Sequence, residues 1–239
     1  MGVNLLEYLQ EEKSMRLKGG LYHHTQIKFS YNTNRIEGSK LSEDQTRYIF
    51  ETNTLGVENN EAVNVDDILE TVNHFKCFDY MLDTAEKPLS ESIIKEFHKL
   101  LKYGTSDSRK EWFKTGDYKL RPNIVGDTET TPPTEVGSAM ENLIASYLKQ
   151  DQIDFDAIVD FHYKFEKIHP FQDGNGRVGR LIMFKESLKA GIVPFIIEDE
   201  NKQYYYRGLK EYKKIQGYLK DTCLHAQDRY SEMLNYFIK

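Results

Sequence analysis

The chain has 239 residues and a formal net charge of −6 at pH 7. This balance argues against a nucleic-acid-binding protein, because no excess of positive charge is present to neutralise an extended phosphate backbone. The sequence contains no run of 18 apolar residues, which excludes a membrane-spanning helix. Residues 1–16 lack the basic, apolar and small-residue order of a signal peptide, so we expect a cytoplasmic protein.

The composition suits one domain of ordinary size, or one domain with an appendage. Hydrophobic residues make up 39% of the chain, which is enough for a core at this length. The two cysteines, Cys77 and Cys223, stand far apart on apolar faces. We therefore expect buried thiols rather than a disulfide or a zinc site.

Helical periodicity dominates the chain from residue 65 onward. Apolar residues between Val65 and Phe78 recur on one face of a helix, and Asn64 is suited to cap its N-terminus. Ser90 is suited to cap a second helix that ends near Leu101. Similar patterns predict five more helices, at about residues 134–149, 155–168, 176–190, 203–214 and 219–238.

One stretch, residues 104–131, interrupts this periodicity with glycines, Pro122 and clusters of Asp and Thr. Within it, residues 117–125 predict a short extended strand or hairpin, and Pro122 favours an edge position. The sequence therefore predicts an all-α fold with one short β-hairpin flap.

The segment His169–Arg180 carries the least ordinary pattern of the chain. Pro170 disfavours the α region at the residue before it, so a helix should end at His169. Gly174 and Gly176 flank Asn175 and permit positive φ angles, which can turn backbone N–H groups inward. A new helix then begins, and its free N–H groups and positive dipole end form a ready anion site.

The charged residues of this segment favour a polyphosphate ligand. Arg177 and Arg180 lie in the first turn of the new helix, where each cation opposes the helix dipole by about 0.3–1 kcal/mol. A bound anion would reverse that penalty. Asp173 supplies one carboxylate, a suitable single protein ligand for Mg²⁺ that arrives with phosphates. His169 is then the candidate general base.

Three other interpretations fit parts of the same segment. Gly174–Gly179 fits a dinucleotide-binding fingerprint, although no alternation of strands and helices surrounds it. Glu166 and His169 form one Glu-x-x-His motif, whereas di-iron bundles need two copies. The segment could also be a plain turn between helices, which explains the glycines but not the convergence of His, Asp and two Arg.

Residues His169–Arg180 match, at every defined position, the signature of the Fic family, His-Pro-Phe-x-(Asp/Glu)-Gly-Asn-Gly-(Arg/Lys)-x-x-Arg. The resemblance extends over about residues 65–197 and implies a Fic-like helical bundle. It divides the chain into an N-terminal helical segment, 1–60, and a catalytic domain with C-terminal helices, 61–239. The resemblance implies a protein adenylyltransferase that transfers AMP from ATP to a Ser, Thr or Tyr hydroxyl of a protein, itself included, and releases pyrophosphate.

The resemblance also implies roles for individual residues. His169 would deprotonate the incoming hydroxyl, and Asp173 would hold Mg²⁺. The phosphates would be bound by Gly174, Asn175, Gly176, Arg177 and Arg180. The intact Gly-Asn-Gly is similar to the AMP-transferring branch, and differs from the Doc kinase branch.

Two further regions match the family less strongly. Residues 116–126 resemble the flap, whose exposed edge can pair with an extended target peptide through Asn123, Ile124 and Val125. Lys119 stands where the family usually has Arg, and a plain surface hairpin is the alternative. Tyr205 and Tyr206 correspond to positions near the adenine, although tyrosines of this kind also serve simply in packing.

The stretch from Thr33 to Gly38 forms a second motif. Thr33 and Glu37 share a helical face, and Gly38 fits the residue that ends the helix. Glu37 lies in the last turn, where a carboxylate opposes the dipole. The stretch resembles the Fic inhibitory motif, (Ser/Thr)-x-x-x-Glu-(Gly/Asn), with Ser39 where relatives often have Asn. The resemblance implies that Glu37 pairs with Arg180 and blocks the seat of the γ-phosphate.

Several functions stay open at this point. The same residues could remove AMP from a modified protein, with Glu37 aligning a water, or could use another nucleotide donor. A non-catalytic module that senses ATP through the loop is a third alternative, against which the intact His169 argues. We expect a protein substrate, no nucleic acid and no membrane as partners, and we leave a homo-oligomer open.

Overall fold

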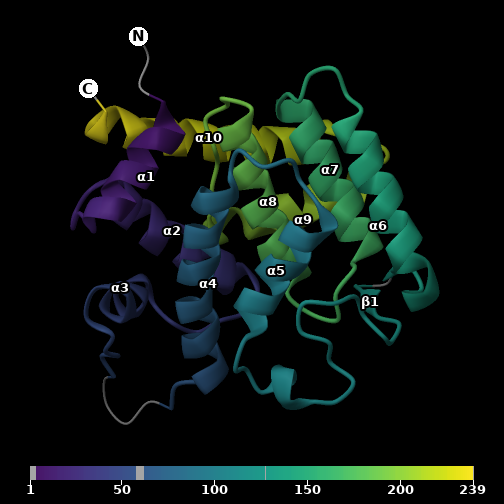
Figure 1. Ribbon diagram of the computed structural model, residues 1–239, viewed down its shortest axis with the longest axis horizontal. Helices are drawn as coiled ribbons and strands as arrows, with labels where there is room; N and C mark the ends of the chain where they lie inside the picture. The colour runs from purple at the N-terminus through teal and green to yellow at the C-terminus, as the bar shows by residue number, and fades with distance from the viewer. Residues whose placement is uncertain (1–3, 58–61, 127, 239) are drawn as a thin grey trace.

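The computed structural model describes residues 4–57, 62–126 and 128–238. Within them the chain forms ten α-helices and one small hairpin (Figure 1). The helices are α1 (Leu5–Met15), α2 (Leu21–Ile36), α3 (Glu43–Thr52), α4 (Val65–Thr84), α5 (Glu91–Lys102), α6 (Pro133–Leu148), α7 (Phe155–Ile168), α8 (Asn175–Lys189), α9 (Lys202–Glu211) and α10 (Gly217–Phe237). None of the helices in these residues combines the length and the apolar character needed to cross a membrane.

The predicted all-α fold is confirmed, and most predicted helix ends lie within a few residues of the observed ones. Asn64 caps α4 by accepting a hydrogen bond from the Asp66 amide (3.0 Å), and Ser90 caps α5 through the Ile93 amide (3.3 Å). Helix α7 has the predicted bounds. Local signals were sufficient here because capping side chains and apolar stripes act over a few residues.

The N-terminal segment contains α1, α2 and α3, of which only the end of α2 was predicted individually. Helix α3 carries a full capping box between Ser42 and Gln45, a signal that sequence inspection could have found. The predicted domain boundary between residues 60 and 61 lies outside the described residues, so this division stays a prediction.

The predicted position of the flap strand is partly wrong. The hairpin consists of β1 (Ile124–Val125) and antiparallel β2 (Thr128–Glu129), with Ile124 opposite Glu129. Residues 117–123 are irregular instead. Pro122 has no N–H for a ladder, and the Lys119 amide donates to the Pro170 carbonyl (2.9 Å) in the loop after α7. The sequence could not reveal this contact. It occupies the Lys119 amide, which a longer strand would need for its own ladder.

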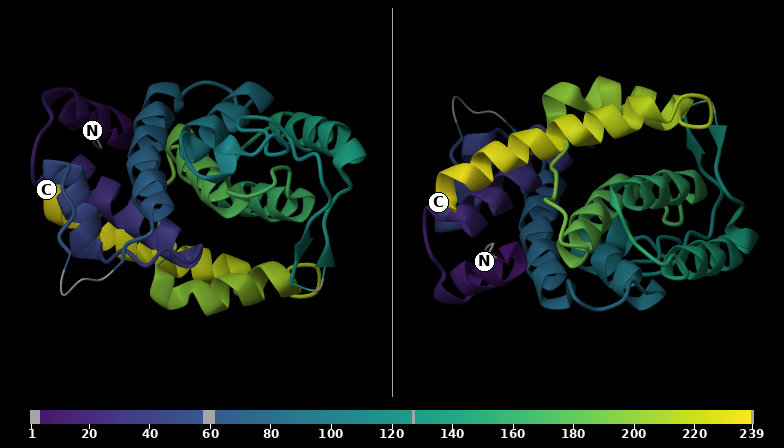
Figure 2. Two further views of the ribbon diagram at one scale, coloured as in Figure 1. Left: turned by 90° about the horizontal axis from the view of Figure 1, so that it is seen from below. Right: turned by 90° about the horizontal axis from the view of Figure 1, so that it is seen from above.

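Helix α8 lies at the centre of the molecule, with α7, α4, α5 and α2 packed around it (Figure 2). Its Phe184 stacks against Phe29 of α2 and meets Phe78 of α4 edge-on, at ring-centroid distances of 5.3 Å and 5.5 Å. Cys77 and Cys223 are buried free thiols, as predicted. The burial of α8 places the first turn of this helix, and the loop before it, inside a rigid frame.

Buried neutral histidines give the fold a predictable response to acid. Burial lowers the pKa of His74, His98 and His162 to about 3, and nearby cations act in the same direction. The unfolded chain has ordinary histidine pKa values near 6.5 and therefore binds protons first as the pH falls. The free energy of unfolding should decrease as the pH falls below about 6.5.

We expect His74→Gln to make this decrease shallower, by at most about 1.4 kcal/mol per pH unit, because one proton uptake is removed. Urea unfolding between pH 7 and pH 4.5 measures the slope. His225→Gln, on the exposed face of α10, is the matched control. Equal slopes for His74→Gln and the unaltered chain would contradict the assignment of His74 as a buried neutral base.

Candidate active site

The loop between α7 and α8 has the shape that its sequence predicts. Helix α7 ends at His169, whose φ of 52° lies in the left-handed region that residues other than glycine seldom adopt. Gly174 takes a φ of 82°, and α8 begins at the next residue. Gly176, in contrast, has ordinary helical geometry, so its lack of a side chain serves another purpose.

The side chain of Asn175 holds this loop in shape. Its Oδ1 accepts from the Phe171 amide (2.8 Å), and its Nδ2 donates to the Phe171 carbonyl (2.9 Å). Phe171 itself stacks on His98 at a centroid distance of 4.0 Å and an angle of 5°. Because both polar ends of the Asn175 side chain are used within the loop, its backbone N–H is the group left for a phosphate. Sequence reasoning missed this clamp.

His169 is a free base at neutral pH. Burial, assisted by the positive charge of Lys119, lowers its pKa to about 4. Its Nδ1 is buried and lies 4.0 Å from Oε2 of Glu166. Burial also raises the pKa of Glu166 to about 8, with the nearby Glu37 charge acting in the same direction. A neutral imidazole beside a loop of backbone N–H groups can accept a proton from a nearby hydroxyl.

The two motifs of the sequence meet at Arg180. Its Nη2 lies 2.6 Å from Oε1 of Glu37, its Nε donates to Oγ1 of Thr33 (2.8 Å), and its Nη2 also donates to the Thr33 carbonyl (3.2 Å). The ion pair that the resemblance implied is therefore present. Burial alone would lower the pKa of Arg180, but the Glu37 carboxylate raises it above its ordinary range.

The Glu37 carboxylate also lies against the start of α8. A Cβ atom built on Gly176 would be only 2.2 Å from Oε1 of Glu37, so the absence of a side chain at position 176 permits this close approach. Glu37 itself caps the C-terminus of α2, and Gly38 follows with a φ of 100°. A carboxylate thus lies at the helix terminus that the sequence predicted to bind anions.

Arg177 and Asp173 belong to a second charged group. Arg177 pairs with Glu70 of α4, and its Nη2 lies 3.3 Å from Oδ2 of Asp173. The same Asp173 oxygen lies 2.7 Å from Nζ of Lys102, which also contacts Glu70 (2.6 Å) and Asp107 (3.2 Å). Burial alone would raise the pKa of Asp173, but Arg177 and Lys102 hold it well below its ordinary range. No sequence pattern marked Glu70 or Lys102.

This arrangement fits a divalent cation that brings most of its own ligands. No cluster of three or more His, Cys, Asp or Glu side chains suited to a metal occurs among the described residues. Asp173 is an ionised carboxylate whose side chain is 46% exposed. One such carboxylate suits Mg²⁺, which keeps several waters and binds substrate phosphates.

The two predicted tyrosines lie around Arg180 and the end of α2. Tyr205 is buried, and its hydroxyl lies 2.7 Å from Nε2 of His162 and 3.5 Å from Nη1 of Arg180. The Tyr206 hydroxyl donates to the Ile36 carbonyl (2.9 Å). Both therefore make packing contacts in this structure, and a role beside an adenine stays a prediction.

The predicted flap residues divide into an anchor and an exposed edge. Asn123 donates from Nδ2 to the Phe171 carbonyl (3.2 Å) and so ties the flap to the loop of His169. Ile124 and Val125 are exposed, at 66% and 49%. Exposed apolar side chains on a short strand suit contact with an extended peptide.

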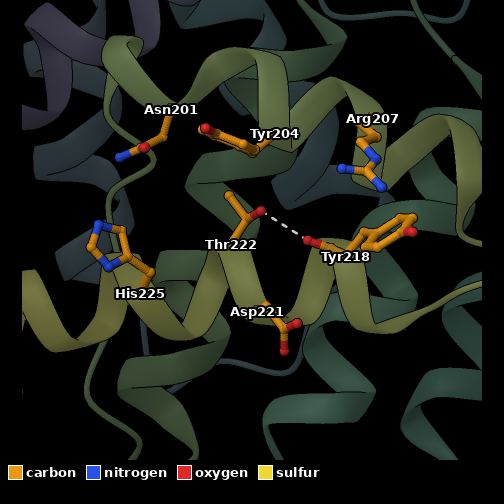
Figure 3. Close-up of a pocket in the computed structure, with 7 residues that line it drawn as sticks. All are labelled: Asn201, Tyr204, Arg207, Tyr218, Asp221, Thr222 and His225. Atoms are coloured by element: carbon orange, nitrogen blue, oxygen red, sulfur yellow. Dashed lines mark hydrogen bonds between the residues drawn. The ribbon is translucent and has the colours of Figure 1, made fainter.

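A cavity of about 370 Å³ lies between α9 and α10, apart from this loop (Figure 3). Its lining contains none of the predicted site residues and consists of Asn201, Tyr204, Arg207, Tyr218, Asp221, Thr222 and His225. The Arg207 guanidinium lies over the Tyr218 ring, 3.8 Å from its centroid, and Thr222 donates to the Tyr218 carbonyl (2.8 Å). The cavity is therefore not the site that the loop forms.

The fold and the site together define a helical domain with an unprotonated imidazole next to a helix N-terminus that carries two arginines. Residues 88–186 match the model of the Fic/DOC family. The matched stretch contains α7, the loop of His169 and most of α8, so this part of the chain is similar to the Fic/DOC family.

Similar proteins agree with this assignment. The chain is 29% identical over 191 residues to a protein named protein adenylyltransferase Fic from Nematostella vectensis, covering 76% of this chain and 42% of the relative. It is also 29% identical over 212 residues to protein adenylyltransferase fic-1 from Caenorhabditis elegans, covering 84% and 39%. The chain thus spans less than half the length of these curated relatives.

Solved structures share the fold. A Fic-domain-containing signaling protein from Bacteroides thetaiotaomicron superposes with a TM-score of 0.72 at 23% identity, covering 97% of this chain and 90% of that one. Fic-1 from C. elegans superposes with a TM-score of 0.71 at 20% identity, covering 97% and 72%. The Fic fold therefore extends over nearly the whole chain, N-terminal helices included.

Two glycines offer a matched test of the packing around the loop. A Cβ on Gly179 would lie 2.8 Å from the His162 ring and 3.0 Å from Oε1 of Glu166, whereas a Cβ on Gly137 of α6 meets nothing within 4 Å. We expect Gly179→Ala to destabilise the fold by about 1–3 kcal/mol through overpacking. Gly137→Ala should stabilise it by about 0.5–1 kcal/mol. Urea unfolding checks both, and similar effects of the two changes would contradict the close packing at Gly179.

Proposed function

We propose that this chain is an autoinhibited protein adenylyltransferase, which transfers AMP from ATP to a hydroxyl group of a protein. The match of residues 88–186 to the Fic/DOC family model and the similarity to relatives named protein adenylyltransferase support the reaction class. One observation carries the proposal of inhibition. The Glu37 carboxylate already occupies the start of α8, against Gly176 and paired with Arg180, where the signature expects phosphates.

In the proposed reaction, the hydroxyl oxygen of the target attacks the α-phosphorus of ATP. A new P–O bond forms, the bond from the α-phosphorus to the bridging oxygen of the β-phosphate breaks, and pyrophosphate leaves. The hydroxyl proton passes to His169, through Nε2 because Nδ1 is buried. The low pKa keeps the imidazole unprotonated and ready, and the remaining catalysis is positioning and charge stabilisation.

The phosphates would lie on the backbone N–H groups of residues 174–176, with Arg180 released from Glu37. Arg177 is held by Glu70 and Asp173, so a phosphate would reach it only by displacing one of these carboxylates. Asp173 would hold Mg²⁺, which when bound neutralises charge on the phosphates. The edge of β1, with Ile124 and Val125, would hold the target peptide.

Inhibition follows from competition for one helix terminus. The Glu37 carboxylate and a γ-phosphate both carry negative charge and cannot share the contacts of Arg180 and Gly176. Thr33 supports the inhibitory arrangement, because its hydroxyl and its carbonyl both accept from Arg180. ATP bound beside Glu37 would therefore be displaced from the position needed for attack.

We expect Glu37→Gly to raise AMP transfer, self-modification included, by about tenfold or more, the effect of a barrier lowered by about 1.4 kcal/mol. Incubation with labelled ATP and Mg²⁺, followed by mass spectrometry, identifies the donor fragment and the acceptor residue together. Glu7→Gly, at an exposed position of α1, is the matched control. Equal labelling of Glu37→Gly and the unaltered chain would rule out the inhibitory role.

His169→Ala in the Glu37→Gly background should reduce labelling by about 10²–10⁴-fold, because the general base is lost. Binding of ATP, followed by calorimetry, should persist. Undiminished labelling would remove His169 from the mechanism, whereas ATP binding without turnover in Glu37→Gly itself would favour a sensing module over an enzyme.

The proposed metal site has its own test. Asp173→Asn in the Glu37→Gly background, or removal of Mg²⁺ with EDTA, should lower AMP transfer by about 100-fold or more, since metal stabilisation of phosphate charge is worth several kcal/mol. Labelling rates at graded Mg²⁺ concentrations measure the effect. A rate that is insensitive to both changes would exclude Asp173 as the metal ligand.

A further inference from the structure

Lys119 has an unusual position beneath the flap. Its side chain is buried, and Nζ donates to Oδ1 of Asn123 (2.7 Å) and Oγ1 of Thr130 (2.6 Å). Asn123 immediately precedes β1 and Thr130 immediately follows β2. One ammonium group therefore joins both ends of the hairpin.

The same residue joins the hairpin to the loop of His169. Nζ lies 3.5 Å from the carbonyl of Ile168, and the Lys119 amide donates to the carbonyl of Pro170 (2.9 Å). Asn123 adds its bond to the Phe171 carbonyl. Both chain neighbours of His169 are thus hydrogen-bonded to Lys119. The two ends of the hairpin and the loop of His169 therefore form one hydrogen-bonded unit.

All three acceptors described for Nζ are neutral oxygens. A buried ammonium with neutral partners keeps most of its electrostatic field, because no carboxylate partner among them cancels it. Burial also lowers the pKa of Lys119 to about 8, so the charge is present at neutral pH and is lost under alkaline conditions.

The field of Lys119 acts on His169. Three charged side chains act on this imidazole from different elements: Lys119 from the flap, Glu37 from the end of α2 and Asp173 from the loop. Glu166 of α7 acts through a backbone hydrogen bond, and its Oε2 lies 4.0 Å from Nδ1 of His169. The Glu37 and Asp173 carboxylates favour the imidazolium, whereas Lys119 opposes it. Lys119 is the cation of this set.

We propose that Lys119 is a positioning residue for AMP transfer, which fixes the base of the target-binding flap to the loop of His169 and whose charge opposes protonation of the imidazole. The proposal rests on the proposed function for its catalytic consequence. The structural coupling does not depend on that function and can be measured separately. An arginine at position 119 would keep its charge at any accessible pH.

The first test measures His169 directly and needs no catalysis. The imidazole of His169, assigned by its disappearance in His169→Ala, is titrated by NMR in the unaltered chain, in Lys119→Met and in Lys119→Arg. Removal of the charge in Lys119→Met should move the titration midpoint to higher pH, and Lys119→Arg should restore the original behaviour. Lys114→Met, at an exposed position before the flap, is the matched control. An unchanged midpoint in Lys119→Met would overturn the proposed effect of the Lys119 charge on His169.

The second test measures the flap and the reaction together, in the Glu37→Gly background. Lys119→Met should raise the KM for the protein target, supplied as the inactive His169→Ala chain, by about tenfold or more, as expected for a lost hydrogen bond from a charged donor. It should also increase amide hydrogen exchange in β1 and β2. As the pH rises from 7 to 9.5, target KM should increase in the lysine form and stay nearly constant in Lys119→Arg.

The outcomes separate the two proposals. If Glu37→Gly transfers no AMP, the proposed function fails, while the NMR titration and the hydrogen exchange still decide the role of Lys119. If AMP transfer occurs and Lys119→Met leaves target KM, hydrogen exchange and the alkaline response unchanged, the positioning role is wrong. Should Lys119→Met not fold, Lys119→Arg against the unaltered chain at pH 9.5 provides the same decision.

Discussion

The ion pair between Glu37 and Arg180 is the interaction on which the rest of the site depends. Each residue alone is misplaced, since a carboxylate opposes the dipole at the C-terminus of α2 and a guanidinium opposes it at the N-terminus of α8. Contact between the two helix ends turns both penalties into one favourable interaction at 2.6 Å. That contact requires Gly176, because any side chain there would collide with Glu37. The packing of α2 against α8 therefore also determines which charges lie at the candidate anion site.

A pair of this kind is well suited to being displaced. The Arg180 side chain is buried, whereas that of Glu37 is 27% exposed. An ion pair that buries a charge contributes little net stability, because desolvation offsets most of the attraction between the charges. A ligand with more negative charge than one carboxylate can therefore take over Arg180 and the helix terminus at modest cost. Thr33 biases the balance toward Glu37 by accepting two hydrogen bonds from the same guanidinium. In the proposed function, the strength of inhibition is then set by the few contacts that Thr33 and Glu37 make with Arg180.

Whether a feature of the fold or the site could be predicted from the sequence depends on the range of the interactions that form it. Local periodicity predicted helices α4 to α8, and Pro170 predicted the turn at His169. Two compact motifs predicted the pairing of Glu37 with Arg180. The other contacts across the fold gave no such signal. Lys102 meets Glu70 and Asp173 although 32 and 71 residues separate them, and Asn175 turns its side chain into the loop rather than outward. The hairpin was misplaced because two-residue strands have no period to recognise.

Local charge balance explains why these long-range contacts matter. Around the start of α8, Arg180 is matched by Glu37, and Arg177 and Lys102 are matched by Glu70 and Asp173. ATP added to this balanced site would bring several uncompensated negative charges into a region of low dielectric. Two changes restore the balance: withdrawal of Glu37, and entry of a divalent cation with the nucleotide. In the proposed function, inhibition by Glu37 and dependence on a metal are therefore consequences of one electrostatic constraint, whatever the net charge of the whole chain.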